Sequence, residues 1–522
     1  MTFLSRFAAG RLGLGPATQK VRVERDLRTT MPDGVVLLAD RYFAPAAPGQ
    51  PLILIRSPYG RRSVAGLLAR IIAERGFQVL MQSTRGTRDS GGVFVPFAHE
   101  REDGLATIDW VLKQPWYGGR LATFGPSYLG NVQWAVCDSP EIVAMAAQVT
   151  SATFEPTMYQ GGGFSLDDAF LWAANQEHVM GVLNPRRFGF NDRVRRRFLD
   201  LPLSSVGRDI SGKQYAWLGR WLDRDAGYWA GCDHRPLVAG TTAPMHITTG
   251  WYDFALPQTM ADYATLVAAG RRPHLTIGPW WHGDMGMFGI ALGESLGWFR
   301  SHLLDDPSGV RELPVRLFVT GADEWREYPS WPSGPERTWY LGPALADEPG
   351  EGSDSYVFDP ADPTPLPGGP LLNSDGKPVV DNRAHEERAD VLVYTSEPLP
   401  ADLEAIGAVR ADLVVRTSRE HADFVVRLCD VHPSGESRNV CDGLVRTSGS
   451  GTREVRVELW PTAHRFAAGH RLRVQVASGA HPRLVRNHGT GEPLGTGVEL
   501  LPCEVEVLHT SSLTVSLGLP PA

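Results

Sequence analysis

The fold is decided by ten residues in the first third of the chain, Leu121-Ala122-Thr123-Phe124-Gly125-Pro126-Ser127-Tyr128-Leu129-Gly130. The apolar run before Gly125 is typical of a buried strand, and residues 131–136 continue with helical character. The pattern therefore predicts that Ser127 stands at a sharp turn from strand to helix. Such a turn lifts the serine hydroxyl out of the sheet edge, where a substrate can reach it.

The pattern Gly-x-Ser-x-x-Gly is weak evidence by itself. In a chain with 56 glycines, such a string arises by chance roughly 0.4 times. It also differs from the general Gly-x-Ser-x-Gly nucleophile turn, because Leu129 stands where the second glycine usually falls. The interpretation of Ser127 therefore depends on the rest of the chain.

Length and composition indicate a globular protein of several domains. The chain has 522 residues, of which 42% are hydrophobic and 21% charged, and its length suggests about two to four domains. The net charge is -8, which argues against nucleic acid as the main partner because no basic face is available for phosphates. Length and composition are also compatible with a homo-oligomer.

The five cysteines are widely spaced and include no Cys-x-x-Cys pair. We interpret them as reduced core residues of a cytoplasmic protein. The first 17 residues are only mildly apolar and contain two arginines, which disfavours a signal peptide. No apolar run reaches the roughly 20 residues that cross a bilayer, so no membrane association is expected.

Strands and helices alternate through much of the chain. After two antiparallel strands between residues 21 and 43, apolar runs at 51–55, 77–81 and 143–149 predict buried strands beside the one before Ser127. Helical patterns at 64–75 and 99–114 separate them. The alternation returns with strands at 245–249 and 275–277 and a helix at 256–269. This rhythm predicts a mostly parallel sheet.

The predicted fold class is α/β, with a helical cap and a C-terminal all-β jelly roll. The rhythm is lost between residues 150 and 240, where helices and loops rich in aromatic residues and arginine are expected. Short strands between turn-rich loops dominate from residue 312 onward. The expected segments are a core at 1–149 and 241–311, a cap at 150–240 and a jelly-roll β-sandwich at 312–522.

Two later loops contain the residues that would activate the serine. A serine hydroxyl needs a histidine to take its proton, and the histidine needs a carboxylate to orient it. Asp253 follows the strand that ends at residue 249, and His282 follows the strand that ends at residue 277. The alternative for Asp253 is a turn or helix N-terminal aspartate, and for His282 a polar loop histidine.

An oxyanion hole requires hydrogen-bond donors aimed at the developing negative charge. The backbone N–H of Tyr128, the residue after the serine, is one candidate. Tyr59 lies in the loop after an early strand and supplies a second candidate through its hydroxyl or a nearby amide. The alternative role for Tyr59 is packing at a strand end.

The chain resembles the cocaine esterase and α-amino acid ester hydrolase group, relatives of X-prolyl dipeptidyl peptidases with a C-terminal jelly roll. The likeness extends over nearly the whole chain. It rests on the Gly-x-Ser-Tyr-x-Gly motif at 125–130, the acid loop at 250–253, the histidine loop at 278–282 and the Pro58-Tyr59 pair. Further matches are 84–86, 90–92, 102–103 and the jelly-roll stretches 396–399, 428–431 and 466–472.

The resemblance implies an α/β-hydrolase core with a Ser127–His282–Asp253 triad. It also implies acyl transfer to water, with Tyr59 and the Tyr128 amide holding the oxyanion and with no metal or organic cofactor. The expected substrates are small-molecule carboxylic esters or amides. The alternatives are an X-Pro dipeptidyl aminopeptidase, an amino-ester or amide acylase, and a binding protein whose jelly roll holds a ligand beside an inactive core.

For the substrate pocket, the sequence gives only candidate residues. Trp172 in the cap and Phe254 beside the acid are candidate substrate-binding residues, with core packing as the alternative. Asp167 and Asp168 are candidates for recognising a substrate amine, with exposed cap charges as the alternative. The arginine-rich run 193–197 indicates a solvated helix face rather than an anion site.

Overall fold

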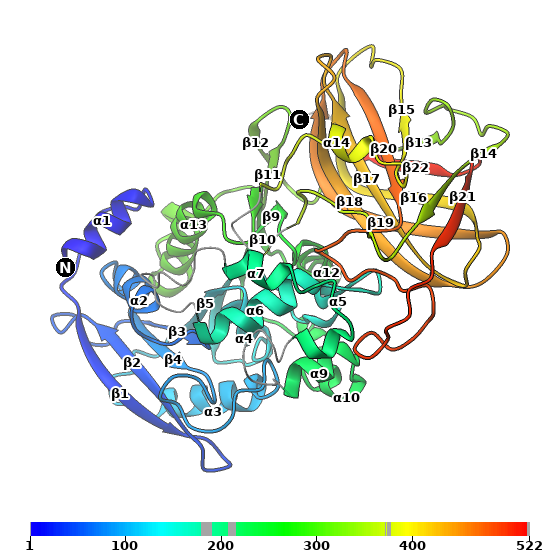
Figure 1. Ribbon diagram of the computed structural model, residues 1–522. Helices are drawn as coiled ribbons and strands as arrows, with labels where there is room; N and C mark the ends of the chain where they lie inside the picture. The colour runs from blue at the N-terminus through cyan, green and yellow to red at the C-terminus, as the bar shows by residue number, and fades with distance from the viewer. Residues whose placement is uncertain (1, 179–189, 207–215, 371, 373–376, 519–522) are drawn as a thin grey trace. The chain divides into compact units, whose positions relative to one another are not determined.

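The computed structural model describes residues 2–178, 190–206, 216–370, 372 and 377–518 (Figure 1). The chain divides into two compact units. The first comprises residues 1–154, 227–250 and 258–315, and the second comprises residues 155–226, 251–257 and 316–522. The division into four segments at residues 149, 240 and 311 stays a prediction.

A twisted sheet forms the centre of the first unit. Its strands are β1 (Arg22–Thr30), β2 (Val36–Phe43), β3 (Leu52–Ser57), β4 (Gln78–Ser83), β5 (Leu121–Pro126), β6 (Ile142–Gln148), β9 (Met245–Tyr252) and β10 (His274–Trp281). They lie side by side in the order β1-β2-β4-β3-β5-β6-β9-β10. β1 and β2 pair antiparallel, and so do β2 and β4. In this order, the neighbouring strands β4, β3, β5, β6 and β9 run parallel, as the sequence predicted.

Helices pack on the parallel strands, which explains why β3 and β4 are buried along their full length. Helix α2 (Val64–Ala73) packs on β2 and β4, α4 (Tyr128–Trp134) on β3, β5 and β6, and α13 (Met285–Leu304) on β5, β6 and β10. The other helices of this unit are α1 (Phe3–Arg11), α3 (Glu100–Leu112), α10 (Ala226–Gly231), α11 (Arg235–Val238), α12 (Leu256–Ala268) and the 3-10 helix η2 (Pro307–Gly309).

The alternation of strands and helices is interrupted after β6, as expected. The second unit begins with short elements and helices, α5 (Glu155–Met158), β7 (Tyr159–Gln160), β8 (Gly163–Phe164), α6 (Leu166–His178), α7 (Phe190–Arg195) and α9 (Ala216–Leu222). Three tryptophans hold α6 and α9 together. Trp172 lies 5.6 Å from Trp217 and 5.9 Å from Trp221, measured between ring centroids.

Antiparallel strands make up the C-terminal part of the second unit. One sheet has the order β13-β22-β16-β21-β14, with β19 also paired to β16, and another has the order β15-β20-β17-β18. Its elements from residue 315 are β11 (Val315–Val319), β12 (Glu324–Tyr328), β13 (Glu336–Tyr340), β14 (Ser353–Phe358), α14 (Arg383–Glu386), β15 (Leu392–Thr395), β16 (Leu403–Thr417), β17 (His421–Val431), β18 (Ser437–Ser448), β19 (Arg453–Phe466), β20 (Arg471–Ala477), β21 (Cys503–Leu508) and β22 (Ser512–Leu517).

Burial alternates along several of these strands. In β16, Val409, Ala411, Leu413 and Val415 are buried, and the residues between them are partly exposed. This period of two places one apolar face of the sheet against the core. The fold class predicted from the sequence, an α/β core with helical insertions and a C-terminal antiparallel β domain, is confirmed.

Within the ranges that the structure describes, we find no helix whose length and apolar character would allow it to cross a bilayer.

Candidate active site

Ser127 stands at the turn between β5 and α4. Its backbone has φ 57° and ψ -125°, a conformation that non-glycine residues rarely adopt. The turn is held by hydrogen bonds on both sides of the serine. The Ser127 N–H donates to the carbonyl of Gln148 in β6 at 2.8 Å, and the Ser127 carbonyl accepts from Gly130 N–H at 2.8 Å. The neighbouring strand and the first turn of the helix thus fix this strained backbone.

The two glycines of the motif are required by close packing. A Cβ atom on Gly125 would lie 2.4 Å from Leu129 Cβ, and one on Gly130 would lie 2.2 Å from Thr150 Cγ2. Thr150 itself donates a 2.7 Å hydrogen bond to the Ser127 carbonyl. The second glycine therefore follows the serine by three residues because Thr150 packs there.

His282 follows β10, and its imidazole reaches the serine. Its Nε2 atom lies 2.9 Å from Ser127 Oγ, and its side chain is 7% exposed. When Nε2 carries no proton, the serine hydroxyl donates this hydrogen bond, which is the arrangement that general-base activation requires. The structure thus brings two of the predicted site residues into direct contact.

Asp253 follows β9 and is fully buried. Its Oδ1 atom accepts a 2.7 Å hydrogen bond from Ala255 N–H, just before α12. This is the turn bond that the alternative interpretation of the aspartate anticipated. The bond also fixes the orientation of the carboxylate, so it is compatible with a second role for Asp253.

The two oxyanion candidates lie at the carboxyl ends of adjacent strands. Tyr59 follows β3, where its backbone N–H donates a 3.1 Å bond to Ser57 Oγ, and its side chain is partly exposed. Tyr128 is the first residue of α4. Its ring is 1% exposed, and its hydroxyl donates a 2.7 Å bond to Glu100 Oε1. The side chain of Tyr128 is therefore directed into the protein core.

The sequence reasoning missed two charged residues beneath this turn. Arg56 in β3 and Glu100 at the start of α3 form an ion pair of 3.0 Å, with side chains 2% and 5% exposed. Burial raises the pKa of the Glu100 carboxyl, although Arg56 and the Tyr128 hydroxyl act in the opposite direction. Arg56, directly after the apolar run Leu52–Ile55 in the same strand, was a signal for this pair, because a buried charge requires a partner.

Both predicted substrate-binding residues belong to the second unit. Trp172 belongs to the tryptophan cluster of α6 and α9, and Phe254 is 3% exposed. Asp167 forms a two-bond ion pair with Arg195, with distances of 2.6 and 2.8 Å. Asp168 accepts a 2.9 Å bond from Ser165 Oγ. The arginine run 193–197 thus contributes one residue to an internal ion pair, rather than forming only a solvated face.

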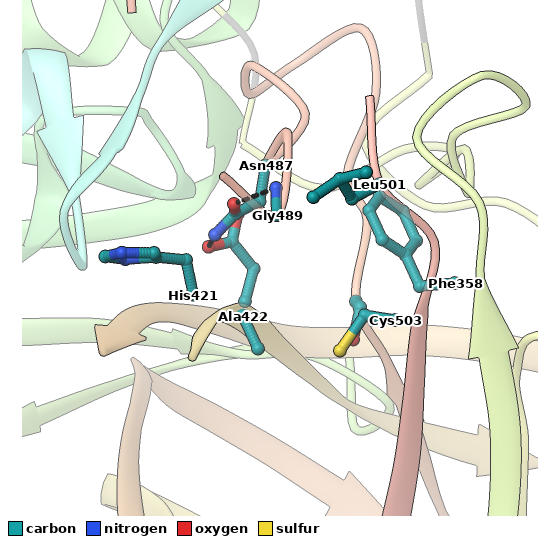
Figure 2. Close-up of a pocket in the computed structure, with 9 residues that line it drawn as sticks. Phe358, His421, Ala422, Asn487, Gly489, Leu501 and Cys503 are labelled. Atoms are coloured by element: carbon teal, nitrogen blue, oxygen red, sulfur yellow. Dashed lines mark hydrogen bonds between the residues drawn. The ribbon is translucent and has the colours of Figure 1, made fainter. Parts of the chain in front are cut away.

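A cavity in the C-terminal β domain bears on the binding-protein alternative. It is lined by Phe358, His421, Ala422, Asp423, Ser478, Asn487, Gly489, Leu501 and Cys503 (Figure 2). Its volume is about 10 Å³, which is room for about one water molecule. Small-molecule sites usually measure about 300–1,000 Å³. This cavity therefore cannot hold an organic ligand.

Comparison with known proteins adds the family. The X-Pro dipeptidyl-peptidase (S15 family) model matches residues 33–284, and the X-Pro dipeptidyl-peptidase C-terminal non-catalytic domain model matches residues 308–500. Cocaine esterase from Rhodococcus sp. (strain MB1 Bresler) is 31% identical, over 90% of this chain and 93% of that protein. The chain is a serine hydrolase of the S15 family. The family that the sequence motifs suggested is confirmed.

Solved structures share the fold of this S15 hydrolase. An aminopeptidase from the marine sediment archaeon Thaumarchaeota archaeon superimposes with a TM-score of 0.82 at 22% identity, covering 97% of this chain and 98% of that one. An α-amino acid ester hydrolase superimposes with a TM-score of 0.82 at 22% identity, covering 96% and 97%. At this level of identity the likeness establishes the fold alone.

Proposed function

We propose that this S15 hydrolase cleaves carboxylic esters of small-molecule substrates through an acyl-enzyme on Ser127. The observation that carries the proposal is the 2.9 Å contact between Ser127 Oγ and His282 Nε2 at the strained turn. A serine held in such a turn with an imidazole in hydrogen-bond reach is equipped for acyl transfer. The esterase name of the relative from Rhodococcus supports an ester as the substrate.

In the proposed reaction, His282 Nε2 removes the proton from Ser127 as the serine oxygen attacks the ester carbonyl carbon. The tetrahedral intermediate collapses, and the imidazolium gives the proton to the departing alkoxide. A water molecule then attacks the acyl-enzyme, with His282 again acting as the base. The acid product leaves, and the Ser127 hydroxyl is regenerated.

Asp253 is the proposed third member of the triad. It follows β9, and His282 follows β10, the neighbouring strand in the sheet. Adjacent loops of this kind place catalytic groups at one edge of an α/β sheet. Full burial of Asp253 supports the proposal, because a buried carboxylate next to an imidazole orients the ring and stabilises its protonated form.

The proposed oxyanion hole consists of the Tyr128 backbone N–H and the Tyr59 hydroxyl. The amide that follows a nucleophilic serine usually supplies the first donor. Tyr59 lies at the end of β3, and β3 pairs with β5, which carries the serine turn. Preorganised donors of this kind each contribute roughly 3–4 kcal/mol to transition-state stabilisation.

The second candidate function is removal of an X-Pro dipeptide from a free N-terminus, as the name of the family model suggests. That reaction requires a carboxylate that binds the substrate amine. The ion pair of Asp167 with Arg195 disfavours Asp167 in this role, since its negative charge is already compensated. This contact favours the ester substrate over the peptide.

The test is a matched set of substrates given to the wild type and to Ser127→Ala. p-Nitrophenyl esters of increasing acyl length are compared with an X-Pro p-nitroanilide. We expect ester turnover that is lost in the variant, with little release of nitroaniline. Preferential release of nitroaniline would replace the esterase proposal by the dipeptidyl-peptidase one.

A further inference from the structure

Three buried side chains contact one another in series beneath the nucleophile turn, from Arg56 through Glu100 to Tyr128. Arg56 lies 3.0 Å from Glu100 Oε2 through Nη2, and its Nη1 donates a 2.8 Å bond to the Glu100 backbone carbonyl. Glu100 Oε1 accepts the 2.7 Å bond from the Tyr128 hydroxyl. One carboxylate therefore connects β3, the start of α3 and the start of α4.

Further hydrogen bonds fix both ends of this series of side chains. Arg56 Nε donates a 3.0 Å bond to Gln82 Oε1 in β4. The Tyr128 hydroxyl accepts a 2.8 Å bond from Phe97 N–H, and the Tyr128 ring stacks on Phe97 with centroids 4.5 Å apart. Phe97 has φ 64°, so its own backbone is held in a conformation that costs energy. The Tyr128 side chain thus has its ring and its hydroxyl fixed by separate contacts.

The Tyr128 hydroxyl is the donor in its bond to Glu100. The pKa of the Tyr128 phenol is raised well above its usual value, mainly by burial and then by the Glu100 charge, so the phenol stays protonated and acts as the donor. Glu100 accepts this bond while facing Arg56. Arg56 and this bond favour the charged form of the Glu100 carboxyl, and they oppose the burial that raises its pKa.

Both proposed oxyanion donors lie on segments that this series of side chains connects. Tyr128 carries one donor on its own backbone, and Arg56 precedes the other donor, Tyr59, by three residues at the end of the same strand. A buried ion pair is seldom more stable than apolar side chains of equal volume. What it supplies is fixed geometry, and here that geometry is imposed on the segments that carry the two donors.

We propose that Glu100 is a positioning residue of the oxyanion hole, which holds Tyr128, and through Arg56 the end of β3, so that the two donors converge. This inference rests on the proposed function and adds to it. Glu100 touches neither substrate nor nucleophile in this account. It acts through the Tyr128 ring on the backbone N–H of the same residue.

The test uses two substitutions that weaken the link with little change in volume. Tyr128→Phe deletes the hydroxyl that donates to Glu100, and Glu100→Gln deletes the charge that faces Arg56. The matched control is Tyr356→Phe in the C-terminal domain. Tyr356 is also buried, at 4% exposure, and its hydroxyl shares a 2.7 Å bond with Ser478 Oγ. The control therefore loses a comparable buried hydrogen bond far along the chain from the serine turn.

The measured quantities are the melting temperature, kcat and KM for a p-nitrophenyl ester, and the rate of inactivation by a p-nitrophenyl alkylphosphonate. The phosphonate places its oxygen where the oxyanion forms, and it releases one nitrophenolate per active site. We expect Tyr128→Phe and Glu100→Gln to lower kcat and the inactivation rate about 10- to 100-fold, with KM changed less than about threefold. The double variant should be no slower than the slower single variant, because both substitutions act on the same link.

Tyr356→Phe should lower the melting temperature to a similar extent and leave both rates unchanged. If Tyr128→Phe and Glu100→Gln lower only the melting temperature, the link is structural and the inference is wrong. Ser127→Ala in the same series separates the two proposals. Phosphonate reaction that persists in Ser127→Ala would overturn the proposed function, whereas reaction that is lost there but unaffected in Tyr128→Phe would overturn the positioning role alone.

Discussion

Ser127 Oγ and His282 Nε2 lie 2.9 Å apart although 155 residues separate them in the chain. The serine sits at the end of β5 and the histidine at the end of β10, on strands of one sheet. The strained backbone of Ser127 is held by bonds to Gln148 and Gly130, so the hydroxyl position is fixed before any substrate arrives. Such preorganisation is what general-base activation of a serine requires.

The first prediction concerns His282, the proposed general base. His282→Gln keeps a polar side chain of similar size but cannot accept and return a proton at neutral pH. We expect kcat for a p-nitrophenyl ester to fall at least about 10³-fold, with a melting temperature within a few degrees of the wild type. Ester turnover within tenfold of the wild type would mean that another group is the base.

The second prediction concerns the close packing behind the nucleophile. Gly130→Ala forces a Cβ to within 2.2 Å of Thr150 Cγ2, and Thr150 holds the Ser127 carbonyl. We expect a loss of unfolding free energy of about 1–3 kcal/mol together with a clear fall in kcat, measured by urea denaturation and ester hydrolysis. Gly10→Ala is the control, since a Cβ there meets nothing within 4 Å in the helix α1. It should leave both quantities unchanged or slightly raise stability.

The third prediction concerns Asp262 in α12. The carboxyl is 3% exposed and accepts a 2.7 Å bond from Ala152 N–H, and burial raises its pKa to about 8. Because this pKa lies above the unfolded value, the folded protein holds a proton that the unfolded chain has lost between about pH 4 and pH 8. Raising the pH through this window therefore removes stability.

Asp262→Asn keeps the acceptor and does not titrate. The melting temperature of this variant should rise relative to the wild type as the pH increases from 5 to 8, by the equivalent of more than about 1 kcal/mol. Asp109→Asn, at an exposed position of α3, serves as the control for removal of a surface carboxylate. A difference between Asp262→Asn and wild type that is the same at every pH would contradict the buried, protonated state of Asp262.

The fourth prediction concerns substrate selection. If Asp167 only neutralises Arg195, Asp167→Asn leaves the preference between an α-amino ester and its amine-free analogue unchanged within about twofold. The measurement is the ratio of kcat/KM for phenylglycine methyl ester and phenylacetic acid methyl ester. A drop of this ratio by tenfold or more would assign amine recognition to Asp167, and would favour the amino-ester or peptidase alternative.

Much of the fold was predictable because periodicity reflects burial. The strands β3, β4 and β6 are rich in apolar residues, although β4 also contains two buried glutamines, since strands covered by helices on both faces need no polar side. Helix α13 was not predicted. Its sequence contains four glycines, which disfavour a helix by propensity. Tertiary packing overrides this cost: a Cβ on Gly297 would lie 2.3 Å from the carbonyl oxygen of Gly309, so the close approach of η2 requires glycine.

The contact between Ser127 and His282 was predictable in part. A serine and a histidine at two strand ends were identified from local motifs, because the turn and the strand pattern are both encoded locally. The Arg56–Glu100–Tyr128 chain was not, since its members come from β3, α3 and α4, and no local pattern pairs them. Strands β21 and β22 were also missed. Each has only six residues, so the alternation of apolar and polar residues in β21 gives a short signal.

The most direct test of the central claim is to locate the nucleophile by covalent labelling. The wild type is incubated with a p-nitrophenyl alkylphosphonate, digested and analysed by mass spectrometry, beside Ser127→Ala and His282→Gln. We predict one equivalent of label on the peptide that contains Ser127, loss of ester turnover in proportion to labelling, no label in Ser127→Ala and much slower labelling in His282→Gln. Label on a different residue, or equal labelling of Ser127→Ala, would contradict the assignment of Ser127 as the nucleophile.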